Sequence, residues 1–110
     1  MSSTTYVVTV IIRNLQSKKC FPFSGAGETQ DEALTEALSL VSPKESPFLN
    51  RLCVALLSEE SLQSTVIRQH QYQAIHQILS ASVTPHAVLA SLKRFPHIGI
   101  VLFYNNIPND

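Results

Sequence analysis

Hydrophobic residues concentrate near both ends of the chain, in segments with the composition of β-strands. Residues 5–13 are rich in β-branched side chains and contain neither glycine nor proline, which predicts a strand. Alternate residues of a strand point to opposite faces. One set here is Tyr6, Val8, Val10 and Ile12, and the other is Val7, Thr9 and Ile11. Because both sets are mostly apolar, the pattern predicts a central strand covered on both faces.

Two further strands are predicted from similar patterns. Residues 97–104 alternate in the same way, with Val101 and Phe103 on one face, and predict the last strand. Residues 20–24 predict a short strand, which Pro22 places at a sheet edge because proline donates no ladder hydrogen bond. Residues 25–27, Gly-Ala-Gly, predict a flexible turn, and the polar residues 105–110 predict a frayed tail.

Helical spacing begins after the glycines. Thr29 and Glu32 form a capping box, in which each side chain accepts a hydrogen bond from the backbone amide of the other residue. The helix that follows ends near Ser42, because Pro43 disfavours helix in the residue before it. Its predicted inward residues are Ala33, Leu34, Ala37, Leu38 and Val41.

Three more helical segments precede the last strand. Ser46 and Pro47 predict a helix start, although the apolar run 52–57 also fits a buried strand. A longer helix is expected from Ser58 to about residue 81, and a short one begins at Thr84. The inward residues predicted for the last two helices are Ile67, Ala74, Ile75, Ile78 and Leu79, followed by Val88, Leu89 and Leu92.

The order of these elements predicts an α+β fold, because the strands do not alternate with the helices. We expect a small sheet of about three strands, made of an N-terminal hairpin plus the C-terminal strand, packed with three to four helices. The length of 110 residues fits one domain that spans residues 1–110.

Charge and cysteine content narrow the function classes. Eight basic and eight acidic residues give a formal net charge of zero, which argues against nucleic-acid binding because that usually needs a basic face. The apolar run at residues 6–12 is too short to cross a bilayer, so no membrane partner is expected. The cysteines, Cys20 and Cys53, match no disulfide framework or zinc motif. Two reduced thiols in a cytoplasmic protein, with no metal or cofactor, are therefore expected.

One short segment resembles parts of known families. Residues 27–38, Gly-Glu-Thr-Gln-Asp-Glu-Ala-Leu-Thr-Glu-Ala-Leu, follow two predicted strands and resemble the strand-to-helix turn of HicB-type antitoxins. They also resemble the second half of double-stranded-RNA-binding domains, which place lysines at this helix start. This chain has Gln30, Asp31 and Glu32 there, so the resemblance does not imply RNA binding.

A polar helix face is the main candidate for partner binding. The long predicted helix carries amide, imidazole and guanidinium groups, which donate or accept hydrogen bonds, at Arg68, Gln69, His70, Gln73, His76 and Gln77. His70 and His76 are six residues apart, which does not match the i, i+4 spacing of a helical two-histidine metal site. A cysteine paired with a histidine is the remaining catalytic option, and no spacing in the chain supports it.

These observations favour a small protein-binding or regulatory protein, such as an inhibitor, an immunity-type protein or an assembly factor, rather than an enzyme. A nucleic-acid-associated factor and a small enzyme that uses histidine or cysteine are the alternatives. Self-association as a homodimer, or a stable complex with another protein, is expected if the helices cover only one side of the sheet. Its surface would then be Val7, Ile11, Val101 and Phe103.

Overall fold

The computed structural model describes residues 4–41, 47–57, 65–81 and 84–108, and these form an α+β fold, as predicted. The strands are β1 (Thr4–Asn14), β2 (Cys20–Gly27) and β3 (Ile98–Pro108). The helices are α1 (Gln30–Ser39), α2 (Pro47–Leu57), α3 (Thr65–Ser80) and α4 (Pro85–Leu92). Residues 47–57 are therefore helical, and the alternative of a buried strand there is wrong.

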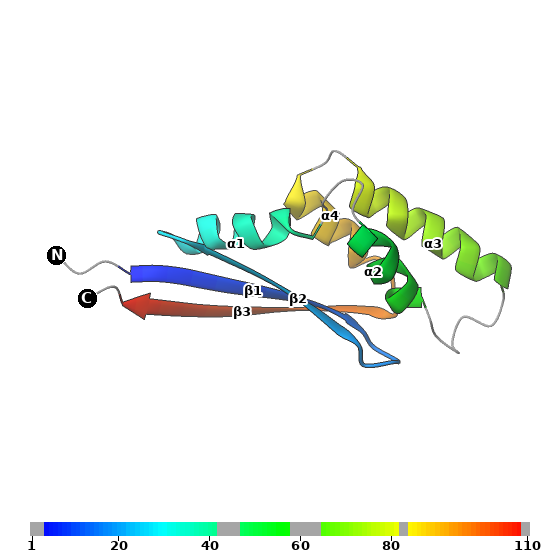
Figure 1. Cartoon of the computed structure of the whole chain (residues 1–110), viewed down its shortest axis with the longest axis horizontal. Coiled ribbons are helices and arrows are strands. Elements are labelled where there is room, and N and C mark those ends of the chain that lie inside the picture. The colour runs from blue at the N-terminus through cyan, green and yellow to red at the C-terminus, as the bar shows by residue number, and fades with distance from the viewer. Residues whose placement is uncertain (1–3, 42–46, 58–64, 82–83, 109–110) are drawn as a thin grey trace.

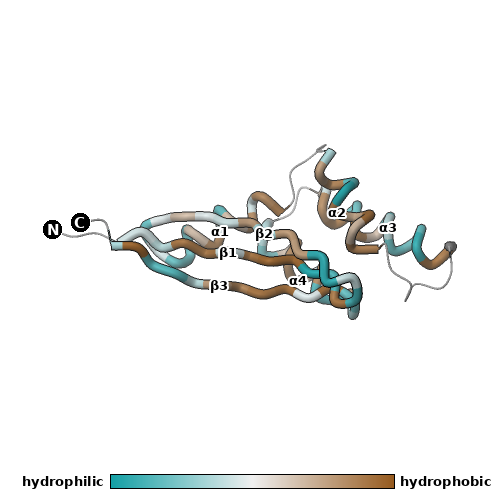
Figure 2. The backbone as a smooth tube through the Cα atoms, turned by 60° about the horizontal axis from the view of Figure 1, so that its bottom comes forward, coloured by the Kyte–Doolittle hydropathy of each residue, from teal (hydrophilic) through white to brown (hydrophobic). Residues whose placement is uncertain are grey.

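The strands form one antiparallel sheet in the order β2-β1-β3. β1 is central and β2 lies at an edge, as the β-branched composition of β1 and the proline in β2 predicted. In the register, Ile11 lies opposite Pro22 on one side and Val101 on the other. The apolar stretches of β1 and β3 run side by side, and the polar β1–β2 turn closes one end of the sheet (Figure 2).

All three strands are longer than predicted, β1 by one residue at each end and β2 and β3 by several residues. Residues 25–27 are not a turn, because they continue β2 and pair with residues 6–8 of β1. Gly25 and Gly27 lie against α1, where an added Cβ would fall 2.3 Å from the backbone nitrogen of Ala37 and 2.7 Å from Cβ of Glu32, respectively. Residues 105–108 are not a frayed tail, because they continue β3 alongside residues 4–7.

The helices of the described chain lie on one side of the sheet (Figure 1). α1 packs on β1 and β2, α2 packs on β1, and α3 packs on α2 and α4. The core lies between the sheet and the helices and includes Val10, Ile12, Leu38, Leu52 and Ile75. The prediction that β1 is covered on both faces is therefore wrong.

Helix α1 begins with half of the predicted capping box. The hydroxyl of Thr29 accepts a hydrogen bond from the Glu32 amide at 3.1 Å. The Glu32 carboxylate, however, accepts from the amide of Glu28 at 3.0 Å instead of the amide of Thr29. The carboxylate thus satisfies an amide in the strand-to-helix connection, just before the cap.

The other helix predictions are confirmed in part. Thr84 caps α4 by accepting from the Ala87 amide at 3.3 Å. The predicted starts at Ser46 and Ser58 lie outside the described residues. The first helix was predicted to end near Ser42, but it ends at Ser39, and the backbone amide of Leu40 caps it by donating to the carbonyls of Ala37 and Leu38. Ile67 was predicted to be buried but is 49% exposed. It lies in the first turn of α3, where the helix projects beyond the elements on which it packs (Figure 1).

Candidate functional site

The sheet face opposite the helices is open, since no helix of the described residues packs on it (Figure 1). We call it the open face. Its residues alternate with those of the core-facing side, so Val8 and Val10 are fully buried while their neighbours are not. The open face consists of Thr5, Val7, Thr9, Ile11 and Arg13 of β1, Cys20, Pro22, Ser24 and Ala26 of β2, and Gly99, Val101, Phe103, Asn105 and Ile107 of β3.

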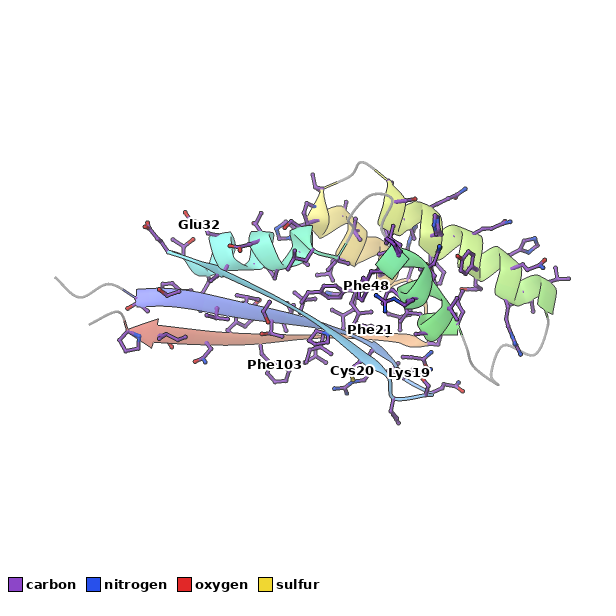
Figure 3. All side chains as sticks on the ribbon, viewed as in Figure 1. Lys19, Cys20, Phe21, Glu32, Phe48 and Phe103 are labelled. Atoms are coloured by element: carbon purple, nitrogen blue, oxygen red, sulfur yellow. The ribbon has the colours of Figure 1, made fainter. Side chains whose placement is uncertain are left out.

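The open face brings together the side chains that the sequence predicted for self-association. Ile11 and Val101 are directly opposite each other on β1 and β3. Phe103 lies opposite Thr9, and Val7 is two residues before Thr9 on the same strand. Phe103 is 54% exposed and points away from the helices (Figure 3). Ile11, Val101 and Phe103 are therefore adjacent apolar residues, whereas Val7 lies opposite the polar Asn105.

Neutral polar side chains lie among the apolar residues of the open face, at Thr5, Thr9, Ser24 and Asn105. The hydroxyls of Thr9 and Ser24 share a hydrogen bond of 2.9 Å across β1 and β2. Arg13, near the β1–β2 turn, is the only charged side chain among the strand residues of this face. The face is therefore suited to an apolar contact rather than to binding a charged ligand.

The second half of β3 is exposed on both sides of the sheet. Residues 103–108 are all exposed, whereas Ile98 at the other end of the strand is buried. Tyr104, which points toward the helix side, is about as exposed as Phe103 on the open face. This end of the sheet therefore exposes one large aromatic side chain on each side of the edge strand.

The polar residues predicted for partner binding lie on α3, on the opposite side of the molecule from the open face (Figure 1). Arg68, Gln69, His70, Gln73 and Gln77 are exposed. His76 is half-buried, and its ring stacks on Tyr72 at 5.8 Å between centroids. The open face and the polar face of α3 are therefore separate surfaces.

The two cysteines have contrasting environments. Cys53 is fully buried in α2, and burial raises the pKa of its thiol to about 11. Cys20 is exposed at the start of β2, where its thiol donates to the carbonyl of Lys18 at 3.5 Å. Both are free thiols. The expectation of two reduced thiols fits the structure.

Alkylation of the native protein by iodoacetamide at neutral pH is expected to modify Cys20 and to leave Cys53 unmodified. Only the thiolate reacts, and Cys53 is both inaccessible and un-ionised at neutral pH. Peptide mass mapping after a timed reaction measures this, and denaturation before labelling should make both thiols reactive. Equal labelling rates in the native protein would contradict the position of Cys53 in the core.

Asn14 is a buried polar residue that the sequence did not single out. Its side-chain nitrogen donates to the carbonyls of Ala55 and Leu56, at 3.2 and 2.6 Å, in the last turn of α2. Its side-chain oxygen accepts from the amides of Gln16 and Ser17, at 2.8 and 3.1 Å. Asn14 therefore links the β1–β2 turn to the end of α2, with all of its amide groups satisfied. Its role is structural.

The described part of the chain has neither a metal-binding cluster nor a membrane-spanning helix. Within it, no three histidine, cysteine or acidic side chains are grouped so that they could hold a metal ion. None of its helices combines the length and the apolar character needed to cross a bilayer.

The comparisons with known proteins add no family to this picture. Neither family models, nor curated proteins, nor solved structures match this chain. Its function is therefore inferred from the chemistry of its own surfaces, of which the open face is the most distinctive.

Proposed function

We propose that this chain is a small protein-binding module that acts by protein–protein contact through the open face. The observation that carries the proposal is the one-sided arrangement of the helices, which leaves Ile11, Val101 and Phe103 on a continuous apolar surface. Monomeric proteins rarely leave large contiguous apolar patches uncovered, and such patches commonly mark interaction sites.

The dimensions of the open face suit a specific interface. Three adjacent strands span about 14 Å, and eleven residues extend about 35 Å along each of the longer strands. The resulting area is about 500 Å² before side-chain relief is included. The smallest stable protein interfaces bury about 600 Å² on each partner. The open face alone is slightly smaller than this minimum, so a stable interface would also have to include residues at the rim of the sheet.

The chemistry of the open face indicates the kind of partner. Valine, isoleucine, threonine and phenylalanine side chains offer apolar contact and few hydrogen bonds. A partner would match them with a flat, apolar and weakly charged surface of its own. Nucleic acid does not match, because it requires a row of basic side chains. Inhibitors, regulatory subunits and assembly factors act through such occluding contacts, and we place the chain among them.

Site-specific photo-crosslinking in cells of the organism that makes the protein tests this proposal. A photoreactive phenylalanine derivative would replace Ala26, which is exposed on the open face, or Gln73, which is exposed on α3. We expect a discrete adduct with another protein from position 26 and none from position 73. Adducts from position 73 alone would instead favour the polar face of α3, and adducts from neither position would contradict the proposal.

A further inference from the structure

We propose that strand β3 pairs with β3 of a second copy of this chain, antiparallel and about a twofold axis, to form a six-stranded sheet. The proposal concerns the free edge of the sheet, and it goes beyond the partner contact assigned to the open face. It rests on the directions of the backbone groups along β3, on the contrast between the two sheet edges, and on the absence of charge along β3.

The alternation of hydrogen-bonded and non-bonded pairs along β1 and β3 shows which backbone groups of β3 point away from β1. The amide of Leu15 donates to the carbonyl of His97 at 3.0 Å, and these two residues continue the β1–β3 register. Bonded and non-bonded pairs alternate in antiparallel sheets. Odd-numbered residues of β3 therefore bond to β1, while even-numbered ones direct their N–H and C=O groups away from it. The outward residues are Ile100, Leu102, Tyr104 and Asn106.

The opposite edge of the sheet is blocked. The amide of Asn14 donates to the carbonyl of Lys19 at 2.9 Å. Asn14 and Lys19 are therefore a hydrogen-bonded pair, which determines which residues of β2 bond to β1. By the same alternation, Pro22 directs its backbone nitrogen toward the free edge of β2. Since that nitrogen carries no proton, this edge is a poor template for another strand. The outward run of β3, residues 100–106, contains no proline.

A second copy is the occupant that best fits this edge. β3 carries no charged residue from Ile98 to Pro108, so two copies can approach without repulsion between like charges. Antiparallel pairing of identical strands also generates the closed twofold symmetry that most homodimers adopt. The exposed half of β3, which includes Phe103 and Tyr104, would then be covered by the partner strand.

One register of the pairing uses the whole strand. The middle residue of β3 is Phe103, and an axis at this residue places Leu102 opposite Tyr104 of the second copy. The outward groups of these residues then bond to each other across the axis. The two Phe103 residues meet as a non-bonded pair, in which side chains lie closest. The two open faces then join into one wider surface on the same side of the six-stranded sheet.

Light scattering of the purified full chain is the first measurement. We expect a mass twice that of the 12.2 kDa chain. Tyr104→Pro removes an outward amide proton and retains the bonds to β1, so a folded protein of single-chain mass is expected. Tyr104→Thr removes the same aromatic ring but keeps the amide, and it should remain a dimer. A wild-type protein of single-chain mass over a wide concentration range, or a folded dimer of Tyr104→Pro, would overturn the proposal.

Cysteine cross-linking keeps the proposal testable even if the proline variant does not fold. In a Cys20→Ser background, Phe103→Cys is expected to form a disulfide between the two copies, because the paired Cα atoms would be about 4.5 Å apart. Asn105→Cys is the matched control, since the two copies of that residue would be about 14 Å apart. A dimer in which position 103 does not cross-link, or in which position 105 cross-links equally well, would contradict the pairing.

Discussion

Gly25→Ala is expected to destabilise the protein by about 3 kcal/mol, at the upper end of the costs of overpacking. An added Cβ would lie 2.3 Å from the backbone nitrogen of Ala37 and 2.4 Å from the carbonyl oxygen of Ala33. Because both contacts are with helix backbone, no side chain can rotate to make room. The variant must move α1 away from the sheet. Urea denaturation followed by circular dichroism measures the loss.

The neighbouring residue provides the control for this prediction. Ala26 lies on the same strand but points to the open face, where it is exposed. Ala26→Val adds more volume than Gly25→Ala, yet it should change the free energy of unfolding by less than about 0.5 kcal/mol. If the two substitutions have similar effects, α1 does not pack on β2 as closely as described here.

Asn14→Asp is expected to cost about 4 kcal/mol at neutral pH. The substitution is nearly isosteric, but it places an acceptor-only oxygen against the carbonyls of Ala55 and Leu56. Two buried hydrogen bonds are lost, and a negative charge is introduced at a fully buried position. Asn105→Asp makes the same chemical change at an exposed position, and its effect should be small.

The loss of stability caused by Asn14→Asp should depend on pH. Burial beside carbonyl oxygens raises the pKa of the introduced carboxyl in the folded state, so the folded protein favours the protonated form. The penalty should therefore be largest above that raised pKa and should decrease as the pH is lowered toward about 4. A difference from the wild type that does not change with pH would show that the carboxyl is not buried.

Local signals in the sequence were sufficient to predict most elements. These signals are the β-branched run of β1, the proline of β2 and the cap residues Thr29 and Thr84. Each of them determines the conformation of the backbone next to it. These predictions did not depend on how the elements pack. The same holds for the alternation that placed Val101 and Phe103 on one face, because the two-residue period of a strand is independent of its neighbours.

The incorrect predictions concern features that depend on tertiary packing. Residues 25–27 have the composition of a turn, yet they form a strand because they pair with residues 6–8 of β1. The glycine at position 25 is needed because α1 lies so close that a side chain there would collide with it. Residues 105–108 form a strand because they pair with the start of β1. Ile67 fits the apolar stripe of its helix, but the neighbouring elements do not extend far enough to bury it.

The candidate surfaces were predictable only in part. Alternation predicted which residues share the open face, but the sequence left open whether the helices would divide between the two faces of the sheet. The hydrophobicity of both faces of β1 predicted that other elements would pack on both faces of the sheet, but the helices pack on only one. The free edge of β3 could not be predicted either, since it depends on the strand order. Asn14 was missed because its partners in α2 are about forty residues away in sequence.

If the open face binds a protein partner, a charge placed on that face should abolish binding without unfolding the protein. Val101→Lys adds a charge at the centre of that face, where the side chain is only half-buried. The yield of the adduct formed from position 26 should be measured in this variant after its cooperative unfolding has been verified. Val10→Lys, on the buried face of the neighbouring strand, should abolish folding and serves as the comparison. We predict that Val101→Lys is folded and forms no adduct. An undiminished adduct in the folded Val101→Lys variant would contradict binding through the open face. If Val101→Lys instead abolished folding as completely as Val10→Lys, Val101 would belong to the core, and this would also contradict it.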